Sequence, residues 1–561
     1  MRYRRYGFRG AGADVLEMSA GRRRWLLVVN LVAVSLVVAT MSALYTSLPD
    51  IAVDIGATQA ELTWIVDSYT LALAALVLTA GALGDRFGRR ATLIVGLALF
   101  TVSSALPLWL DSPLWVIMLR AVAGVGAAFV MPSTLSLLTA SFPSDRRGAA
   151  VGMWAGFAGV GGIIGLLGSG LMLKVWTWKA IFGVYAVIGL VVLIAAFTIG
   201  ESVASRVGRP DVFGAVFSAL AVGGVVFGLI EGAHTSYSEP LVTVALVVAA
   251  ASVVAFVLVE LRVADPLLDV RYFRRRGFTT GSVSVALQFL TIFGFFLLIV
   301  QFLQLVKDYD ALSASLALAP MVVPVMVFSL LSPRITAAVG LRAVSVVGVG
   351  AIAAGMVFLS RLSVDSGYWD ILWPMLVASI GLGLSTAPAT SAIVSDVPSD
   401  EQGVAAAVND AMREVGAAIG IALSGSILAG RYAAGIVDVL PGVPEAGRQA
   451  VESSFAGARE FGAAAGPSGQ AVVDAAAGIF ADGISSALFA LGMVAAGAAV
   501  LLLFVAPGRG YVALGDADTD TDTGTSGDPD PGADPAPVGA AGGTSGYPVA
   551  GSQEVRRRPA R

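Results

Sequence analysis

Gly81-Ala82-Leu83-Gly84-Asp85-Arg86-Phe87-Gly88-Arg89-Arg90 separates two apolar runs, at 62–83 and 91–110. Each run is long enough to cross a hydrocarbon core about 30 Å thick as a helix. The glycines permit a tight turn, and the Asp and Arg side chains can pair across the helix ends and complement the helix dipoles. We expect a connection that latches one state of the molecule; the alternative is a loop whose basic charge only sets its orientation.

The composition places the chain in a membrane. Of its 561 residues, 57 % are apolar and 13 % are charged, whereas soluble globular domains carry about 25 % charged residues. Apolar runs of about 20 residues suit a transmembrane helix, and we count fourteen of them between residues 25 and 506. The sequence therefore predicts an all-α integral membrane protein.

The residue inventory excludes several kinds of site. The chain has no cysteine and one histidine, His234, which leaves no thiol chemistry, zinc finger or His-rich metal site. It shows neither the basic face of a nucleic-acid binder nor a P-loop. We expect no metal, no cofactor and no nucleic-acid partner. A membrane-bound transferase is disfavoured, because no D-x-x-x-D run lies in an inner loop between spans.

Lys and Arg divide unevenly between the two sides of the membrane. With a cytoplasmic N-terminus, the inner segments hold 26 of the 35 and the outer loops hold seven. This positive-inside bias predicts a plasma-membrane protein with both termini in the cytoplasm. Outside the spans, we expect 430–481 to form a long extracellular loop, rich in Ala and Gly, that could be partly helical. Residues 507–561 have too little apolar content to fold, so we expect a disordered tail.

Ionisable residues deep in a span are costly in lipid and mark candidate functional positions. Asp67 stands in the second span, in Trp64-Ile65-Val66-Asp67-Ser68-Tyr69. We interpret it as a carboxyl that takes up a proton or a cationic substrate; the alternative is a helix-end Asp bonded to a neighbouring span. Four aromatic residues are candidates for lining an apolar substrate cavity, although they could equally face lipid: Tyr45, Trp64, Tyr69 and Trp154.

Two further positions carry buried charge. Asp410, Arg413 and Glu414 fall at i, i+3 and i+4, on one face of the thirteenth span. Their net charge of −1 leaves a carboxylate to titrate, unless the group is only a neutralised structural cluster. Arg120 stands near the middle of the fourth span, where it either tunes a nearby acid or is a satisfied structural residue.

The fifth span is dense in glycine, with Gly165 and Gly170 near its end. Small residues at three- and four-residue spacing allow close helix contact and bending.

These motifs together resemble the major facilitator superfamily, in its fourteen-span drug:proton antiporter branch. The Gly81–Arg90 stretch is similar to the family's signature between spans 2 and 3, and Leu119–Ala127 to its span-4 Arg motif. Gly165–Gly170 resembles the antiporter motif, although Leu166 replaces the usual Pro. Thr40 stands where the family often carries an acid in span 1. A proton site in span 1 is therefore less expected, and Asp67 becomes the stronger candidate. The resemblance covers roughly 25–506.

The resemblance implies a specific layout. A cytoplasmic segment at 1–24 precedes a six-helix bundle at 25–200, and two inserted helices with a basic cytoplasmic loop occupy 201–277. A second six-helix bundle at 278–506 includes the long extracellular loop. Substrate then binds between the bundles, which rock about it.

The resemblance also implies proton-coupled efflux of small lipophilic, cationic drugs by a monomer. Protons are then carried by Asp67 together with Asp410 or Glu414, with Arg120 tuning them. The latch residues are Gly81, Gly84, Asp85, Arg86, Gly88, Arg89 and Arg90. A dedicated exporter of an endogenous antibiotic or lipid metabolite on the same scaffold remains the alternative.

Overall fold

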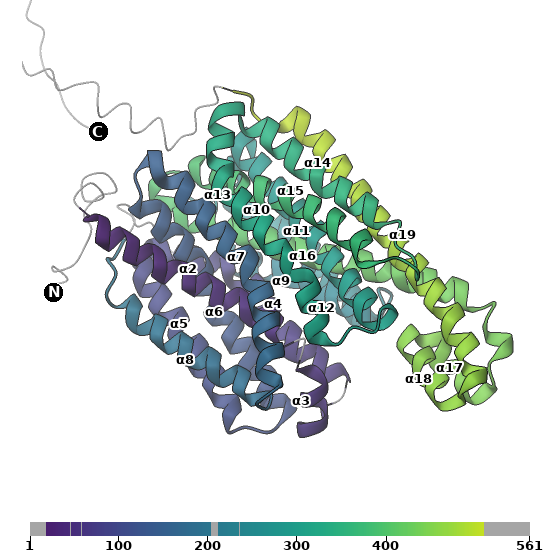
Figure 1. The fold of residues 1–561 in the computed structure, drawn as a ribbon. Helices are drawn as coiled ribbons and strands as arrows, with labels where there is room; N and C mark the ends of the chain where they lie inside the picture. The colour runs from purple at the N-terminus through teal and green to yellow at the C-terminus, as the bar shows by residue number, and fades with distance from the viewer. Residues whose placement is uncertain (1–17, 45–46, 58, 203–210, 235, 510–561) are drawn as a thin grey trace, which may run out of the picture. The chain divides into compact units, whose positions relative to one another are not determined.

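A computed structural model of the chain describes residues 18–44, 47–57, 59–202, 211–234 and 236–509. Within these ranges the chain is helical and contains no strand (Figure 1). Fourteen helical segments are long and apolar enough to cross a membrane, as the sequence predicts. Helices suit lipid because every backbone polar group is then paired within its own segment.

Helices of the first half are α2 (Ala20–Ala43), α3 (Leu48–Ile55), α4 (Gln59–Phe87), α5 (Arg89–Ala105), α6 (Pro113–Ser141), α7 (Ser144–Leu173) and α8 (Lys179–Ala196). The inserted pair is α9 (Val212–His234) and α10 (Pro240–Glu260). Helices of the second half are α11 (Arg276–Gln301), α12 (Ala311–Leu318), α13 (Val322–Val339), α14 (Leu341–Leu359), α15 (Tyr368–Ser395), α16 (Gln402–Ile436), α17 (Glu445–Ser453), α18 (Phe455–Ala465) and α19 (Pro467–Val505). Short helical turns complete the chain: η1 (Leu106–Leu108), η2 (Val270–Arg274), η3 (Phe302–Val306), η4 (Ala319–Met321), η5 (Ser399–Glu401) and η6 (Leu440–Gly442).

The spanning helices pack in two groups. In the first, α6 packs against α4 and α5, α2 against α7, and α5 against α8. In the second, α11 packs against α16, and α14 packs against α15 and α19. The groups meet mainly where α4 and α6 pack against α16 and where α7 packs against α13, α15 and α12.

The inserted helices cover one of these seams. Helix α9 packs against α10 and also against α4 and α16, so it touches both groups. A small buried apolar cluster forms there from one residue of each of α4, α9 and α16: Ala74, Val226 and Ala418. Most of α10 is exposed, as expected of a helix that faces lipid.

The connection between α4 and α5 is shorter than the sequence suggests. Helix α4 continues to Phe87 and α5 begins at Arg89, so Gly88 alone lies outside a helix. Its φ of 111° is adopted readily only by glycine. The expected loop at 84–90 is therefore corrected to a one-residue break, and its charged side chains project from two helix ends.

The expected outer loop at 430–481 is also largely helical. Helices α16 and α19 extend into it, and α17 and α18 pack beside them to form what we call the cap, residues 430–481 (Figure 1). The Phe480 ring lies 5.0 Å from that of Phe455 and 6.2 Å from that of Tyr432, between ring centroids. These aromatic contacts belong to an apolar cluster that continues from the cap into the second group of helices. Most of the expected N-terminal segment, and the tail beyond Arg509, lie outside the described residues.

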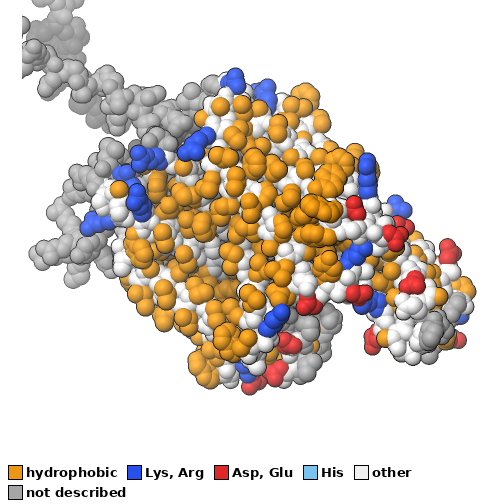
Figure 2. Space-filling model, in the orientation of Figure 1, with side chains coloured by type: hydrophobic (Ala, Val, Ile, Leu, Met, Phe, Trp, Pro, Cys, Tyr) orange, Lys and Arg blue, Asp and Glu red, His pale blue; other side chains and the backbone are white. Residues whose placement is uncertain are grey.

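Charge divides between the two ends of the helices. Figure 2 shows apolar side chains along the helix faces, with Lys and Arg gathered at one end and most acidic side chains toward the other, including the cap. We call the first the basic end; it carries Arg22, Arg89 and Arg146. The cap lies at the opposite end.

Candidate functional site

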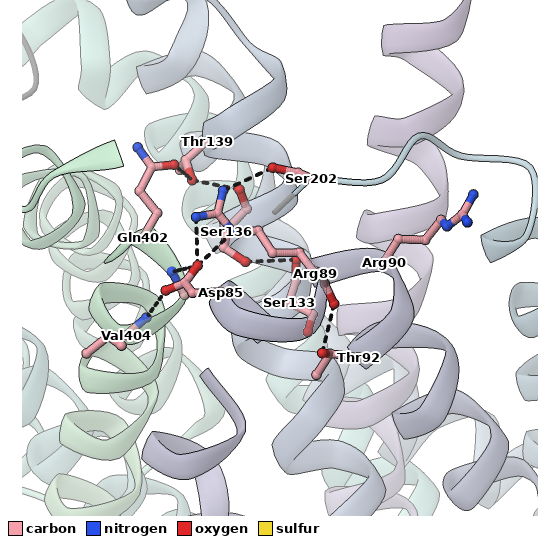
Figure 3. A network of polar contacts seen from close by, with 12 residues as sticks. Asp85, Arg89, Arg90, Thr92, Ser133, Ser136, Thr139, Ser202, Gln402 and Val404 are labelled. Atoms are coloured by element: carbon pink, nitrogen blue, oxygen red, sulfur yellow. Dashed lines mark hydrogen bonds and ion pairs between the residues drawn. The ribbon is translucent and has the colours of Figure 1, made fainter. Parts of the chain in front are cut away.

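At the basic end, one carboxylate joins the two groups of helices (Figure 3). Arg89 donates to Asp85 Oδ1 through Nη2 at 2.7 Å and Nε at 2.9 Å, and both side chains are buried. The same carboxylate accepts the backbone N–H groups of Gly403 and Val404, each at 3.0 Å, at the start of α16. A negative charge at a helix N-terminus is stabilised by the exposed amides and the helix dipole. Asp85 therefore fixes α4 to α16.

Two more contacts reinforce this junction. Thr139 of α6 donates to Gln402 Oε1 at 2.8 Å (Figure 3). Gly81 crosses Gly403 so closely that a Cβ on Gly81 would lie 2.4 Å from the Gly403 carbonyl oxygen. We call this set the latch: Gly81, Asp85, Arg89, Thr139 and Gln402–Val404.

The remaining residues of the signature stretch serve the first group of helices. Arg90 extends away from Asp85 (Figure 3), and its Nη1 donates to the Ile199 carbonyl at 3.0 Å. Glu201 accepts the N–H groups of Arg90 and Ala91, at 2.9 and 3.1 Å, and so caps α5. Arg86 lies over the Phe87 ring, and Gly84 has ordinary contacts only. Sequence reasoning missed Glu201, because more than a hundred residues separate it from Arg90.

A second missed contact ties the connection between α10 and α11, residues 261–275, to the start of α16. We call this connection the strap. Tyr272 of the strap donates its hydroxyl to Glu401 Oε2 at 2.9 Å. Burial raises the pKa of Glu401, and the hydrogen bond from Tyr272 offsets part of that shift. The basic residues of the strap were noted from the sequence, but nothing there indicated this pairing.

A central cluster forms on α16, as the i, i+3, i+4 spacing predicts. Asp410, Arg413 and Glu414 are 1 %, 7 % and 7 % exposed. Arg413 Nη1 lies 3.6 Å from Asp410 Oδ1. The Arg413 guanidinium also lies over two rings, 4.5 Å from the centroid of Phe289 on α11 and 5.6 Å from that of Trp154 on α7. Such cation–π contacts strengthen when water is excluded.

Arg120 and Tyr69 extend this cluster into the first group of helices. Arg120 donates from Nε to the Ile65 carbonyl at 3.0 Å, and its guanidinium lies 4.3 Å from the Tyr69 ring centroid. The charges of both Arg120 and Glu414 act on Tyr69. We call the set the central cluster: Tyr69, Arg120, Trp154, Phe289, Asp410, Arg413 and Glu414. Glu414 is therefore the acid whose charge acts on the same tyrosine, Tyr69, as the charge of Arg120.

Asp67 lies on a different face of α4. Two residues along a helix correspond to a rotation of about 200°, so Asp67 points away from the Tyr69 side. It shares its face with Trp64 and Ala74, and the Trp64 ring lies 5.9 Å from that of Phe227 on α9. Asp67 is half-buried on the face that meets the inserted helix and α16.

The other predicted residues either pack closely against neighbouring helices or lie outside the described part of the chain. On α7, a Cβ on Gly165 would lie 2.2 Å from the Ala39 carbonyl oxygen of α2, and Gly170 faces Leu312 of α12. Trp154 Nε1 donates to Thr134 Oγ1 at 3.0 Å. Tyr45 lies outside the described residues. In the described part of the chain, no group of three or more His, Cys, Asp or Glu side chains is arranged to hold a metal.

Known proteins resemble this chain along most of its length. A family model described as Major Facilitator Superfamily matches residues 31–421. The multidrug efflux pump LfrA of Mycolicibacterium smegmatis is 32 % identical, over 85 % of this chain and 96 % of its own. The methyl viologen resistance protein SmvA of Salmonella typhimurium is 30 % identical, over 86 % and 97 %. The structure of the proton:xylose symporter XylE superposes with a TM-score of 0.56 at 13 % identity, covering 90 % of this chain and 99 % of that one.

Proposed function

The chain belongs to the Major Facilitator Superfamily, and from that premise we propose that it is a proton-coupled exporter of small lipophilic cations. Its relatives include proteins named for multidrug efflux and for methyl viologen resistance. Methyl viologen is a dication, which the carboxylates of Asp410 and Glu414 can attract. We propose that it acts as a monomer in the plasma membrane, with its basic end in the cytoplasm.

The central cluster is the observation that carries this proposal. It places two buried carboxyls, Asp410 and Glu414, on the same face of α16 as Arg413, whose guanidinium lies over the rings of Phe289 and Trp154 from the two groups of helices. Aromatic faces and carboxylates together recognise organic cations. A carboxyl that binds either a proton or a cation exchanges one for the other when the site changes sides. Competition for the same acid would couple the two flows.

The latch supports alternating access. Asp85 holds α16 against α4 at the basic end, so the structure is closed there. Opening that end requires Asp85 to release the Gly403 and Val404 amides, while the opposite end closes. Two discrete packings of rigid groups of helices are the usual basis of such switching. We propose that this structure is closed toward the cytoplasm.

Asp67 enters the proposal as a second proton carrier. Its half-buried position on the face of α4 that meets α9 and α16 lies away from Arg120. The surroundings of a carboxyl at this position change when the two groups of helices move, because α4 belongs to one group and α16 to the other. The proposal therefore has Asp410 and Glu414 at the substrate and Asp67 at the seam.

The test is efflux of methyl viologen from vesicles under an imposed pH gradient, with purified protein. Asp410→Asn and Glu414→Gln, alone and together, should lower pH-driven efflux at least tenfold. Glu460→Gln, an exposed carboxyl on α18, is the matched control and should transport like wild type. Undiminished pH-driven efflux in the double variant would refute proton coupling by the cluster. A susceptibility panel in a pump-deficient host that protects against one compound only would favour a dedicated exporter.

A further inference from the structure

A second pair of carboxyls, one buried and one half-buried, lies outside the central cluster, at the basic end of the inserted helices. Glu260 ends α10, and Asp211 precedes α9. Glu260 is 1 % exposed, and its Oε2 accepts the N–H of Leu268 in the strap at 3.3 Å. Asp211 Oδ1 accepts the N–H of Gly214 at 2.7 Å. Each carboxyl thus has one oxygen satisfied by the backbone.

The other oxygen of each carboxyl is buried and has no hydrogen-bond partner among the described residues: Glu260 Oε1 and Asp211 Oδ2. Both point at the same spot. A Cβ on Gly214 would lie 2.4 Å from Glu260 Oε1 and 2.6 Å from Asp211 Oδ2. Together these distances place the two oxygens no more than 5.0 Å apart. Glycine at 214 leaves the room that lets them converge.

In the part of the chain that the structure describes, no cation compensates the two carboxyls. Among the described residues, neither Glu260 nor Asp211 forms an ion pair. The charged groups that act on Glu260 from the elements packed against it are Asp211 at the start of α9 and Asp269 in the strap, both acidic. Arg271 pairs with Asp269 instead, at 3.8 Å.

Two ionised carboxylates at this separation and burial repel strongly, and each keeps an unsatisfied lone pair. One proton resolves both problems, because an O–H on one carboxyl can donate to the free oxygen of the other. We propose that Asp211 and Glu260 form a proton-binding site in which the two carboxyls share one proton. The proton joins the start of α9 to the end of α10 and, through Leu268, to the strap.

The location gives the shared proton a role apart from substrate exchange. Helix α9 rests on both groups of helices, and the strap reaches the start of α16 through Tyr272 and Glu401. Loss of the proton leaves two repelling charges where α9, α10 and the strap meet. The inserted pair then loosens at its basic end.

The test is infrared spectroscopy of the purified chain in lipid nanodiscs. The background variant carries Asp67→Asn, Asp410→Asn and Glu414→Gln, so the result does not depend on whether those acids couple protons to transport. At neutral pH we expect a protonated-carboxyl band that disappears in both Glu260→Gln and Asp211→Asn. Each amide can donate to the remaining carboxylate, so both variants should fold. Glu239→Gln, an exposed acid at the other end of α10, should leave the band unchanged.

A second measurement is thermal stability against pH. The background variant should lose melting temperature from neutral to alkaline pH, and Glu260→Gln should lose less. A band that persists in both Glu260→Gln and Asp211→Asn would overturn the proposal. So would a band abolished at neutral pH by added sodium or calcium, since the pair would then be a metal-ion site.

Discussion

At the scale of single residues, the two glycines of the signature stretch on α4 have different reasons to be glycine. A Cβ on Gly81 would lie 2.4 Å from the Gly403 carbonyl oxygen and 2.5 Å from the Ala407 Cβ. A Cβ on Gly84 would meet its nearest neighbours at 3.8 Å, an ordinary contact. Of these two glycines, only Gly81 is required for the close crossing of α4 and α16.

Gly81→Ala should therefore open the basic end, whereas Gly84→Ala should not. The added methyl cannot be accommodated without separating α4 from α16, at a cost of about 1–3 kcal/mol to the closed state. We expect a population shift of about 5- to 150-fold toward the state open at that end. Distances between spin labels on α4 and α16 would measure it. Equal distance distributions for the two variants would contradict this account of the latch.

At the scale of elements, α16 carries most of the functional contacts. The start of α16 donates the backbone N–H groups that bind Asp85 in the latch. Its middle carries the acids and the arginine of the central cluster, and its end extends into the cap. It is positioned by close packing on α11: a Cβ on Gly420 would lie 1.9 Å from the Leu290 carbonyl oxygen. Backbone contact of this kind is possible only with glycine at the crossing.

Gly420→Ala should accordingly destabilise the protein, while Gly430→Ala on the same helix should not. The first change forces α11 and α16 apart and displaces Phe289 from Arg413. Gly430 has no neighbour within 4 Å, so alanine there should be neutral or stabilising by up to about 1 kcal/mol. Melting temperatures of the purified variants decide the matter, and a stable Gly420→Ala protein would argue against this crossing.

The strap provides a pH-dependent contact at the same end. Because burial raises the pKa of Glu401, the folded state holds its proton more tightly than the unfolded state does. Its contribution to stability is therefore present at acidic pH and declines as pH rises above the ordinary glutamate value of 4.5 through the raised pKa. Glu401→Gln should show a smaller decline in melting temperature over that window. Glu460→Gln, exposed on α18, should follow wild type, and parallel curves for all three would contradict the assignment.

At the scale of the whole molecule, the features predictable from sequence are those that depend on neighbours along the chain. Fourteen spans follow from apolar run length, and the alignment of Asp410, Arg413 and Glu414 follows from helical periodicity. The partners of these three residues on other helices cannot be predicted from the sequence in this way. Phe289 stands more than a hundred residues before Arg413, so its ring contact exists only because α11 packs on α16. The Ala- and Gly-rich composition of 430–481 allows some helix there, but it does not indicate where α17 and α18 begin or that they pack beside α16 and α19.

Orientation is the whole-molecule property that the charge pattern predicts and that a direct experiment can measure. The basic end should face the cytoplasm and the cap should face outward, because Lys and Arg resist translocation. The chain has no cysteine, so a single introduced cysteine gives a label without background. Ala475→Cys, exposed in the cap, should react with a membrane-impermeant thiol reagent in intact cells. Gly508→Cys, exposed beyond α19, should react only after the cells are permeabilised.

The two labelling sites make the orientation test independent of transport. Both introduced side chains are exposed, and Gly508 has no neighbour within 4 Å, so neither change should perturb packing. Reversed labelling would place the latch, the strap and the Asp211–Glu260 pair outside the cell. The latch would then close the extracellular side instead of the cytoplasmic side.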